Sequence, residues 1–490
     1  MATSHPMLVP YKPTDADPFD ARKAAHLLNR AGFGGTPAEI DRVVQMGPYD
    51  AVDWLLDFPD APAEELSQDD IPNLSAVEGY PRNFREYRRL LDQQPNREKR
   101  MELTQQFQAA NREVVRETMG WWLRRMAYGP FAMQEKLTLF WHGHFTTSAR
   151  DERSAMLIWE QNECLRRHAA LNFRTLVHNI SRDPAMLDYL NNTQNKKQRP
   201  NENYARELME LFTLGIGHYT ENDIKEAARA FTGWAHEGEA FVFRRFDHDF
   251  DDKTFFGRRG NWDGSDIIEL ILAKKRCATY IGGKVWSYFV SETVDDSLAA
   301  SLGDVLMDNK YEMRPFLRAV FTSKGFYDDK TIGNQIKSPV QLMVGSIRLL
   351  GLEMPPFGPM NNALEQMGQQ PLMPPNVKGW PGGRTWINTA TLFVRYNTGV
   401  WLAGGDVPAS TGRQMLDKVQ KRRGGVKFTP RGGNDAEAVV DDWVARLIQR
   451  PIDAKSRKTL VDVLGNQPSR EENVRRMVQL IVSMPEYQLC

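Results

Sequence analysis

Cysteine is scarce in this chain, and its three copies lie far apart. Cys164, Cys277 and Cys490 form no Cys-x-x-Cys pair. This spacing excludes a cysteine-based zinc site and a disulfide-stapled scaffold, because both need cysteines that are numerous or closely spaced. A reducing compartment is the simplest interpretation, and one disulfide among the three stays open.

An excess of either charge sign is also absent. Sixty-three Lys and Arg residues balance 63 Asp and Glu residues in a chain of 490. The chain as a whole therefore has no electrostatic attraction for nucleic acid or for an anionic membrane, and we expect no nucleic-acid partner. Hydrophobic residues make up 41% of the chain and charged residues 26%, values typical of a globular protein with a sizeable core.

Long apolar runs are missing. None approaches the roughly 20 residues that a membrane-spanning helix needs, so no transmembrane segment is expected. Residues 1–28 contain no basic stretch followed by an apolar one, and they do not resemble a signal peptide. The sequence as written therefore predicts a cytoplasmic protein, and export with the leader already removed stays an alternative.

Common catalytic motifs are missing as well. The chain contains no GxSxG, GxxxxGK[ST] or HExxH sequence, and no GxGxxG between a strand and a helix. Serine hydrolases with a nucleophile elbow, P-loop enzymes, zincins and Rossmann dehydrogenases therefore have no support in the sequence. A Ser-His-Asp set assembled from distant residues stays open.

Helical periodicity dominates the sequence. Apolar residues recur every three or four positions along most of the chain, and Thr36-Pro37-Ala38-Glu39 has the form of a helix-capping box. The main predicted helices cover residues 83–128 (as one helix or two), 131–141, 153–181, 204–214, 222–232, 265–274, 276–290, 295–307, 312–323, 338–350, 388–403, 436–450 and 470–484. The sequence thus predicts a mainly α protein with a large multi-helix body.

Two segments break the helical pattern. Residues 240–246 and 253–257 are rich in Phe and flank an acidic turn, which predicts one small β-hairpin near 240–257. Residues 351–385 carry seven prolines, which predicts a long irregular Pro/Gly-rich segment that wraps the body. The predicted organisation is a flexible N-terminal arm at 1–20, a main helical body at 21–350, and the wrap with C-terminal helices at 351–490, packed on the same body.

His142 and His144 form the first candidate site. Gly143 between them disfavours a helix, so we expect a turn here. Two imidazoles on a turn can bind one transition metal, and neutral imidazole suits Fe, Zn and Cu. Glu135 lies about two helical turns earlier and can supply a third ligand or orient a histidine. In the alternative interpretation, Glu135 pairs with basic side chains and the histidines form hydrogen bonds in a buried turn.

Glu207 and Glu210 form the second candidate site. They are three residues apart on a predicted helix and can face one point. Helical bundles build metal sites from such carboxylates and facing histidines. We predict both as catalytic carboxylates, and Glu207 also as a metal ligand. The alternative is an ordinary charged helix face that uses Arg206 to pair with Glu202 and Glu210.

His248 is a third candidate, at the predicted hairpin turn. It lies among Asp247, Asp249, Asp251 and Asp252, and an Asp-rich loop can hold Ca²⁺ or a transition metal. We predict His248 as a further metal ligand. The alternative is a solvated turn.

Residues 374–383 read PPNVKGWPGG and form a fourth candidate. The aromatic ring of Trp380 on a rigid irregular segment can act as a platform for flat ligands, or it can plug the core under a long loop. We favour the plug.

Several ordered segments together resemble a known family. They read EKLTLFWHGHFTTS, DPAMLDYLNN, NENYARELMELFTLGIGHYTENDIKEAARAFTGW, HDFDDKTFFG and PPNVKGWPGG. From about Ala24 to about Asn397, the chain resembles the large bacterial family catalogued as domain of unknown function 1800. The resemblance implies no established activity. It does imply a sulfatase-like partner protein, because such proteins are often encoded beside family members. The family often has a histidine where this chain has Phe212.

Two functions follow from these patterns. The first is a metal-dependent oxidoreductase or hydrolase, in which a transition metal activates water or dioxygen. Its predicted metal ligands are His142, His144, Glu135, Glu207 and His248. The second is a non-catalytic binding or assembly protein that works with the sulfatase-like partner. In that case the charged groups are paired structurally, and residues 374–383 or 191–203 form the contact surface. The substrate stays unknown.

Overall fold

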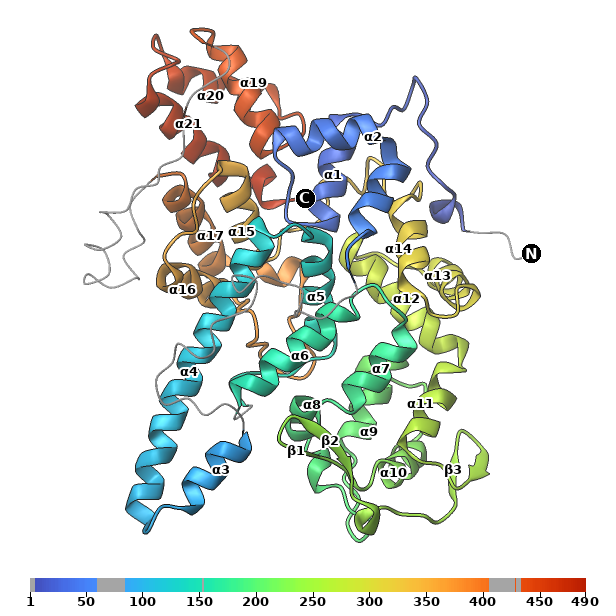
Figure 1. Cartoon of the computed structure of the whole chain (residues 1–490). Helices are drawn as coiled ribbons and strands as arrows, with labels where there is room; N and C mark the ends of the chain where they lie inside the picture. The colour runs from blue at the N-terminus through green and yellow to red at the C-terminus, as the bar shows by residue number, and fades with distance from the viewer. Residues whose placement is uncertain (1–4, 60–83, 152–153, 405–427, 429–432) are drawn as a thin grey trace.

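The structure is a computed structural model that describes residues 5–59, 84–151, 154–404, 428 and 433–490 (Figure 1). Twenty α-helices lie within these residues, with two small antiparallel sheets. The prediction of a mainly α protein is therefore confirmed. No helix in this described part of the chain is long and apolar enough to cross a membrane.

The first hydrophobic core lies in the part of the molecule drawn on the right of Figure 1. Large buried side chains such as Phe173, Phe212 and Trp286 fill it. Its helices are α1 (Ala21–Ala31), α2 (Pro37–Leu56), α7 (Phe173–Ser181), α8 (Pro184–Tyr189), α9 (Asn203–Glu207), α10 (Glu221–Ala230), α11 (Gly264–Leu272), α12 (Lys275–Phe289), α13 (Asp296–Asp308) and α14 (Met313–Phe321).

The second core lies on the left of Figure 1 and contains Trp122, Trp443 and Tyr487. Its helices are α4 (Arg97–Tyr128), α15 (Pro339–Leu350), α16 (Phe357–Met367), α17 (Thr389–Leu402), α19 (Ala436–Leu447), α20 (Ala454–Leu464) and α21 (Glu471–Ser483). Helix α3 (Phe84–Asp92) packs on α4. The predicted boundary at residue 350 does not separate the two cores, because α4 and α15 share a core with the C-terminal helices.

Helices α5 (Ala132–His144) and α6 (Ala155–Arg167) lie between the two cores. On α5, Leu137 and Trp141 belong to the first core, and Leu139 belongs to the second. On α6, Leu165 belongs to the first core and Ile158 belongs to the second. Helix α5 is therefore buried on nearly all sides, and its polar side chains need partners inside the protein.

The predicted turn at His142-Gly143-His144 is wrong, because α5 continues through His144. The propensity of Gly143 is overridden by packing. The ring of Trp380 lies 3.6 Å from the position of a Cβ on Gly143, and a Cβ on Gly379 would collide with the Gly143 carbonyl oxygen. Glycine at both positions lets the Pro/Gly-rich segment lie directly on the end of α5.

The predicted single hairpin is replaced by two. Strand β1 (Trp234–Glu237) pairs with β2 (Ala240–Phe243), and β3 (Lys253–Phe255) pairs with β4 (Arg258–Gly260). Each pair closes through a two-residue turn, which requires positive φ. Gly238 and Gly257 supply it, with φ of 65° and 75°. The two Phe-rich segments therefore do not pair with each other. Each pairs with a strand that is adjacent to it in the sequence.

Other boundaries also differ from the prediction. The helix predicted at 153–181 is split into α6 and α7, because Asn172 caps a new helix. The helix predicted at 204–214 changes after α9 into a π-helix, η6 (Leu208–Thr213). The wrap at 351–385 contains α16, and α20 was not predicted at all.

The N-terminal segment is packed from residue 5 onward. It begins with a short 3-10 helix, η1 (Pro6–Leu8). The Tyr11 backbone N–H then donates to the Thr322 carbonyl at 2.8 Å, and the rings of Tyr11 and Phe19 both contact Tyr327. Residues 5–20 therefore belong to the body.

Candidate functional site

Glu135, a predicted metal ligand, lies at the centre of a buried ion-pair network. Its side chain is 1% exposed. Arg166 donates to both of its carboxylate oxygens at 3.0–3.1 Å, Trp122 Nε1 donates at 2.9 Å, and Arg125 Nε also donates. Burial alone raises the pKa of Glu135, but the charges of Arg166 and Arg125 outweigh it and hold the pKa below its usual value. The alternative interpretation, pairing with basic side chains, describes this geometry.

The network joins three helices, because Arg125 lies on α4, Glu135 on α5 and Arg166 on α6. Arg166 also pairs with Glu163. Its guanidinium donates a further hydrogen bond to the side-chain oxygen of Asn162 at 2.8 Å. Two arginines thus face two carboxylates inside the protein. A buried charge is stable only when it is compensated in this way.

The structure does not bring His142 and His144 together. Because α5 is helical here, two residues of separation place them about 200° apart around the helix. The His142 ring packs between Trp122 and Trp380, with both ring centroids 5.6 Å away. The His144 ring points to the other side, where its Nε2–H donates to the Phe212 carbonyl at 3.0 Å.

Both histidines are buried without charge. Burial lowers the pKa of His142 to about 4. Burial, followed by the charge of Lys284, lowers the pKa of His144 to about 3. His142 Nε2 is buried without a hydrogen-bond partner among the described residues.

His144 closes the end of the π-helix η6. The last carbonyls of a helix lack partners within the helix, and here side chains from α5 and α12 supply donors. Tyr280 donates to the Leu211 carbonyl at 2.9 Å, and Arg276 Nε donates to the Leu214 carbonyl at 2.7 Å. No sequence pattern marks Tyr280 and Arg276 as donors to this helix end, because the pairing depends on how α12 packs.

Phe212 occupies the position where the family often has a histidine. Its ring centroid lies 6.1 Å from that of His144 and 5.3 Å from that of Phe145. The phenylalanine is fully buried in the first core. In this chain the position therefore serves packing around His144.

Glu207 and Glu210 lie at the start of the π-helix. Glu210 accepts a hydrogen bond from Tyr219 at 2.8 Å. Glu207 is half-buried, and it makes no hydrogen bond or ion pair with another described residue. Burial, then the nearby charge of Glu210, raises the pKa of Glu207, while Lys378 and Arg206 oppose the shift. The segment 374–383 therefore reaches this face through Lys378.

Arg206 satisfies part of the alternative interpretation of this helix. It pairs with Glu202 at 3.1 Å and with Glu221 at 2.8 Å. The charged face predicted for the helix thus exists on the side of Glu202. Glu207 lies outside these ion pairs.

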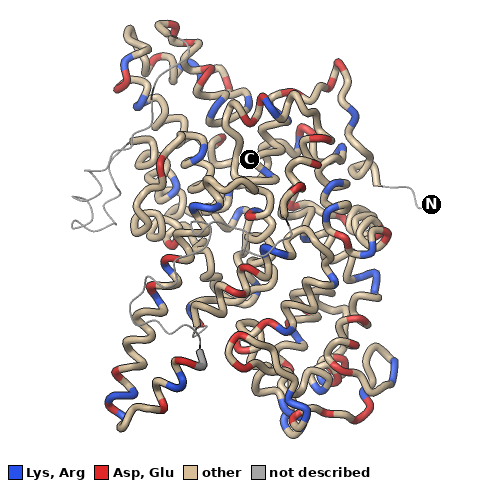
Figure 2. Tube along the Cα trace, viewed as in Figure 1, with Lys and Arg blue, Asp and Glu red and all other residues tan. Residues whose placement is uncertain are grey.

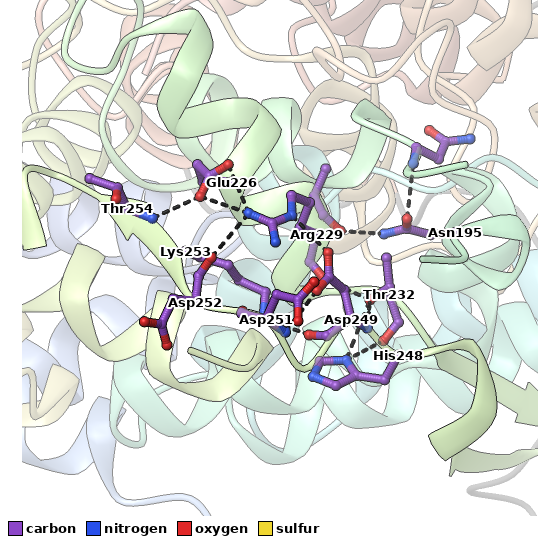
Figure 3. A network of polar contacts seen from close by, with 12 residues as sticks. Asn195, Glu226, Arg229, Thr232, His248, Asp249, Asp251, Asp252, Lys253 and Thr254 are labelled. Atoms are coloured by element: carbon purple, nitrogen blue, oxygen red, sulfur yellow. Dashed lines mark hydrogen bonds and ion pairs between the residues drawn. The ribbon is translucent and has the colours of Figure 1, made fainter. Parts of the chain in front are cut away.

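His248 lies in a closed loop (Figure 3). Its Nδ1–H donates to the Thr232 carbonyl at 2.8 Å. The buried Lys253 ammonium donates to the carbonyls of Asp249 and Asp251 at 2.6 and 3.0 Å, and Arg229 pairs with the Asp249 carboxylate at 2.7 Å. The ammonium therefore fills the place in the acidic loop that a bound cation would take.

Trp380 packs against the second core, and Trp386 is buried close to it in the sequence. Trp386 is buried, and Trp380 is partly buried against His142. Their positions agree with the plug that we favoured over an open platform.

The five predicted ligands thus each have different surroundings. In the described part of the chain, no three His, Cys, Asp or Glu side chains are arranged to hold a metal ion. Whether the protein binds a metal stays a prediction.

The fold and these sites define a two-core helical protein in which the buried carboxylates of Glu135 and Glu163 pair with Arg125 and Arg166. The family model described as "Protein of unknown function (DUF1800)" matches residues 26–489. The chain therefore belongs to this family, and the resemblance found in the sequence is confirmed. No curated protein and no solved structure matches the chain.

Substitution of Glu135 by Gln should lower the free energy of unfolding by about 3–5 kcal/mol, because it leaves two buried guanidinium groups undercompensated. The matched control is Glu113→Gln on α4, whose partner Arg116 lies at 3.0 Å with both side chains about half exposed. That change should cost less than about 1 kcal/mol. Urea unfolding at pH 7 measures both. A loss below about 1 kcal/mol in Glu135→Gln would contradict the structural role of the network.

The two histidines should make the protein sensitive to acid. Their pKa values are lower in the fold, about 4 and 3, than the ordinary 6.5. The unfolded chain therefore binds more protons, so stability is complete above pH 6.5 and falls as the pH drops toward 4. Between pH 7 and 5 each histidine should cost about 2 kcal/mol.

Urea unfolding of His142→Leu at the two pH values tests this expectation. The loss between pH 7 and 5 should be smaller than in the wild type by about 2 kcal/mol. Substitution of the exposed His218 by Gln is the control and should leave the loss nearly unchanged, because its ring contacts water. An unchanged loss in His142→Leu would refute the buried neutral state.

Proposed function

We propose that this protein is a binding or assembly protein that works with a partner, rather than a metal enzyme. One observation carries the proposal: most of the predicted ligand groups are engaged in the fold. Glu135 binds Arg125 and Arg166, and His144 holds the end of η6. His248 holds Thr232. A binding or assembly protein needs no free metal ligands, so we expect these groups to be paired with other parts of the fold.

The sulfatase-like protein that the family resemblance implies is the proposed partner. The segment 374–383 supports a contact surface on the side of α5, because Lys378 and Asn376 are exposed there. The segment is anchored underneath by Gly379 against Gly143. A surface of this kind is formed before binding, so little ordering entropy opposes association.

A second candidate function is proton transfer at Glu207 and Glu210. Two features favour it. The carboxylates sit in different environments, since Tyr219 holds Glu210 and Glu207 has a raised pKa without a hydrogen-bond partner among the described residues. Paired carboxylates in different environments are typical of acid–base sites. They also lie on a π-helical turn, which is frequent at functional sites.

Co-expression with the sulfatase-like protein tests the first proposal. We expect the two chains to elute together in size-exclusion chromatography, with no stoichiometric Fe, Zn or Cu in this chain by elemental analysis. The control is the chain expressed alone, which should elute later than the complex but remain folded. A chain that stays solitary in the presence of the partner would refute the assembly function. Stoichiometric metal that is lost in His142→Ala/His144→Ala would instead restore the metal enzyme.

Substitution of Glu207 by Gln tests the second candidate. The folded-state pKa of Glu207 is raised, so the folded protein binds this proton more tightly than the unfolded chain. The carboxylate therefore costs stability as the pH rises above its ordinary range. Glu207→Gln should raise the Tm at pH 8 and have little effect on it at pH 4.5. The gain at pH 8 should correspond to less than about 1 kcal/mol, because the group is half exposed.

Glu210→Gln is the matched control for that measurement. Its side-chain amide oxygen can still accept the Tyr219 hydrogen bond, so we expect no comparable gain in Tm. Equal Tm values for Glu207→Gln and the wild type at pH 8 would remove the support for a carboxylate held for proton transfer.

A further inference from the structure

An exposed group of aromatic and basic side chains lies at the end of the lobe that contains α8–α10 and the two hairpins. We name it the Phe246 tip. It consists of Phe243, Phe246, Phe250, Lys196, Lys197, Arg199, Arg244 and Arg245, all exposed. Figure 2 shows Lys and Arg gathered at the lower end of this lobe. The tip is a local departure from the balanced charge of the chain.

The tip is convex and apolar at its centre. Phe246 lies on a short 3-10 helix, η7 (Arg245–Asp247), and is 91% exposed. Phe243 and Phe250 flank it at 44% and 45% exposure. Three exposed phenylalanines thus lie within eight residues of sequence, and exposed apolar side chains gathered in this way mark binding surfaces.

The framework under the tip is rigid (Figure 3). Arg229 holds Asp249, Lys253 holds two loop carbonyls, and His248 is packed between Phe243 and Phe250 with centroids 5.0 and 4.6 Å away. These contacts hold the residues on the C-terminal side of η7, and the Phe246 ring points into solvent.

The basic loop is fastened to the same framework. The Lys197 backbone N–H donates to the Asp247 carbonyl at 2.8 Å. The buried Asn195 accepts from the Gly233 N–H at 3.0 Å and donates to the Ala228 carbonyl at 2.8 Å. Residues 196–199 and 243–250 therefore present one surface.

Positive charge predominates on that surface. Asp247 pairs with Lys196 at 3.5 Å, and Asp249 is engaged by Arg229. Asp252 pairs with Arg259 at 3.2 Å, which leaves Asp251 as the remaining aspartate among residues 247–252. Four further basic residues have no carboxylate within ion-pair distance among the described residues, and Arg245 instead lies over the Phe250 ring at 5.2 Å. They are Lys197, Arg199, Arg244 and Arg245.

We propose that the Phe246 tip binds the surface of a membrane that contains anionic phospholipids, with the Phe246 ring inserted among the headgroups. Basic residues beside an apolar side chain are the arrangement that such a surface attracts, since each base contributes electrostatically and the ring contributes by burial. A lipid surface also accepts a convex tip without a matching pocket. A protein partner would need a pocket shaped for Phe246. This inference does not rest on the assembly function.

Co-sedimentation of the full chain with vesicles tests the proposal. We expect binding to vesicles of equal parts phosphatidylglycerol and phosphatidylcholine, little binding to pure phosphatidylcholine, and weaker binding as salt increases. Phe246→Ser should reduce the partition coefficient about tenfold. Arg244→Glu/Arg245→Glu should reduce it at least about twentyfold, because each base is worth roughly fivefold.

Matched controls lie on the other lobe. Phe393 on α17 is 69% exposed, and Lys455 and Lys458 on α20 are exposed. Phe393→Ser and Lys455→Glu/Lys458→Glu should bind like the wild type.

Absence of wild-type binding to the anionic vesicles would overturn the proposal, and so would equal losses in the tip and control variants. If the wild type ignored vesicles while Phe246→Ser broke the complex with a purified partner, the tip would be a protein-binding surface and the membrane proposal would be refuted. Circular dichroism confirms that each variant is folded. The complex with the sulfatase-like protein, measured separately, shows whether the assembly function stands.

Discussion

The buried carboxylate of Glu135 is the constraint on which the rest of the structure depends. It lies where α4, α5 and α6 meet, and it is compensated only when Arg125 and Arg166 reach it together. Since an uncompensated buried charge is costly, the three helices have one favourable register. That register places α5 between the two cores and determines what each of its side chains faces.

The course of α5 in turn decides what its histidines can do. A continuous helix sends His142 toward Trp122 and Trp380 and sends His144 toward the end of η6. The first packs in the aromatic part of the second core, and the second supplies a donor to a helix end in the first core. The two rings therefore couple α5 to both cores. Their separation follows from helix geometry alone, whatever ligand the protein binds.

Local rules predicted the parts of the fold that local forces decide. The capping box at Thr36 is present, with Glu39 accepting from the Thr36 backbone at 2.7 Å, and the helical class follows from apolar periodicity. Three features escaped prediction, for different physical reasons. Gly143 remains helical because the Trp380 ring packs over it. The strand at 240–243 pairs backward because Gly238 permits a tight turn.

The third feature is the acidic loop, where sequence reasoning identified the residue types and missed their use. Four aspartates around His248 suggest a cation site, and a cation is indeed there in the form of the Lys253 ammonium. Nothing in the local pattern says that a lysine at the start of β3 folds back into the loop. The pairing of the loop's acidic and carbonyl groups beneath the surface also affects the charge that the loop exposes. Lys253 and Arg229 engage the loop from beneath, and on its outer side Arg244 and Arg245 have no carboxylate partner in the part of the chain that the structure describes. A chain of zero net charge can in this way carry a strongly basic surface, since charge balance over the whole sequence does not fix where each sign is exposed.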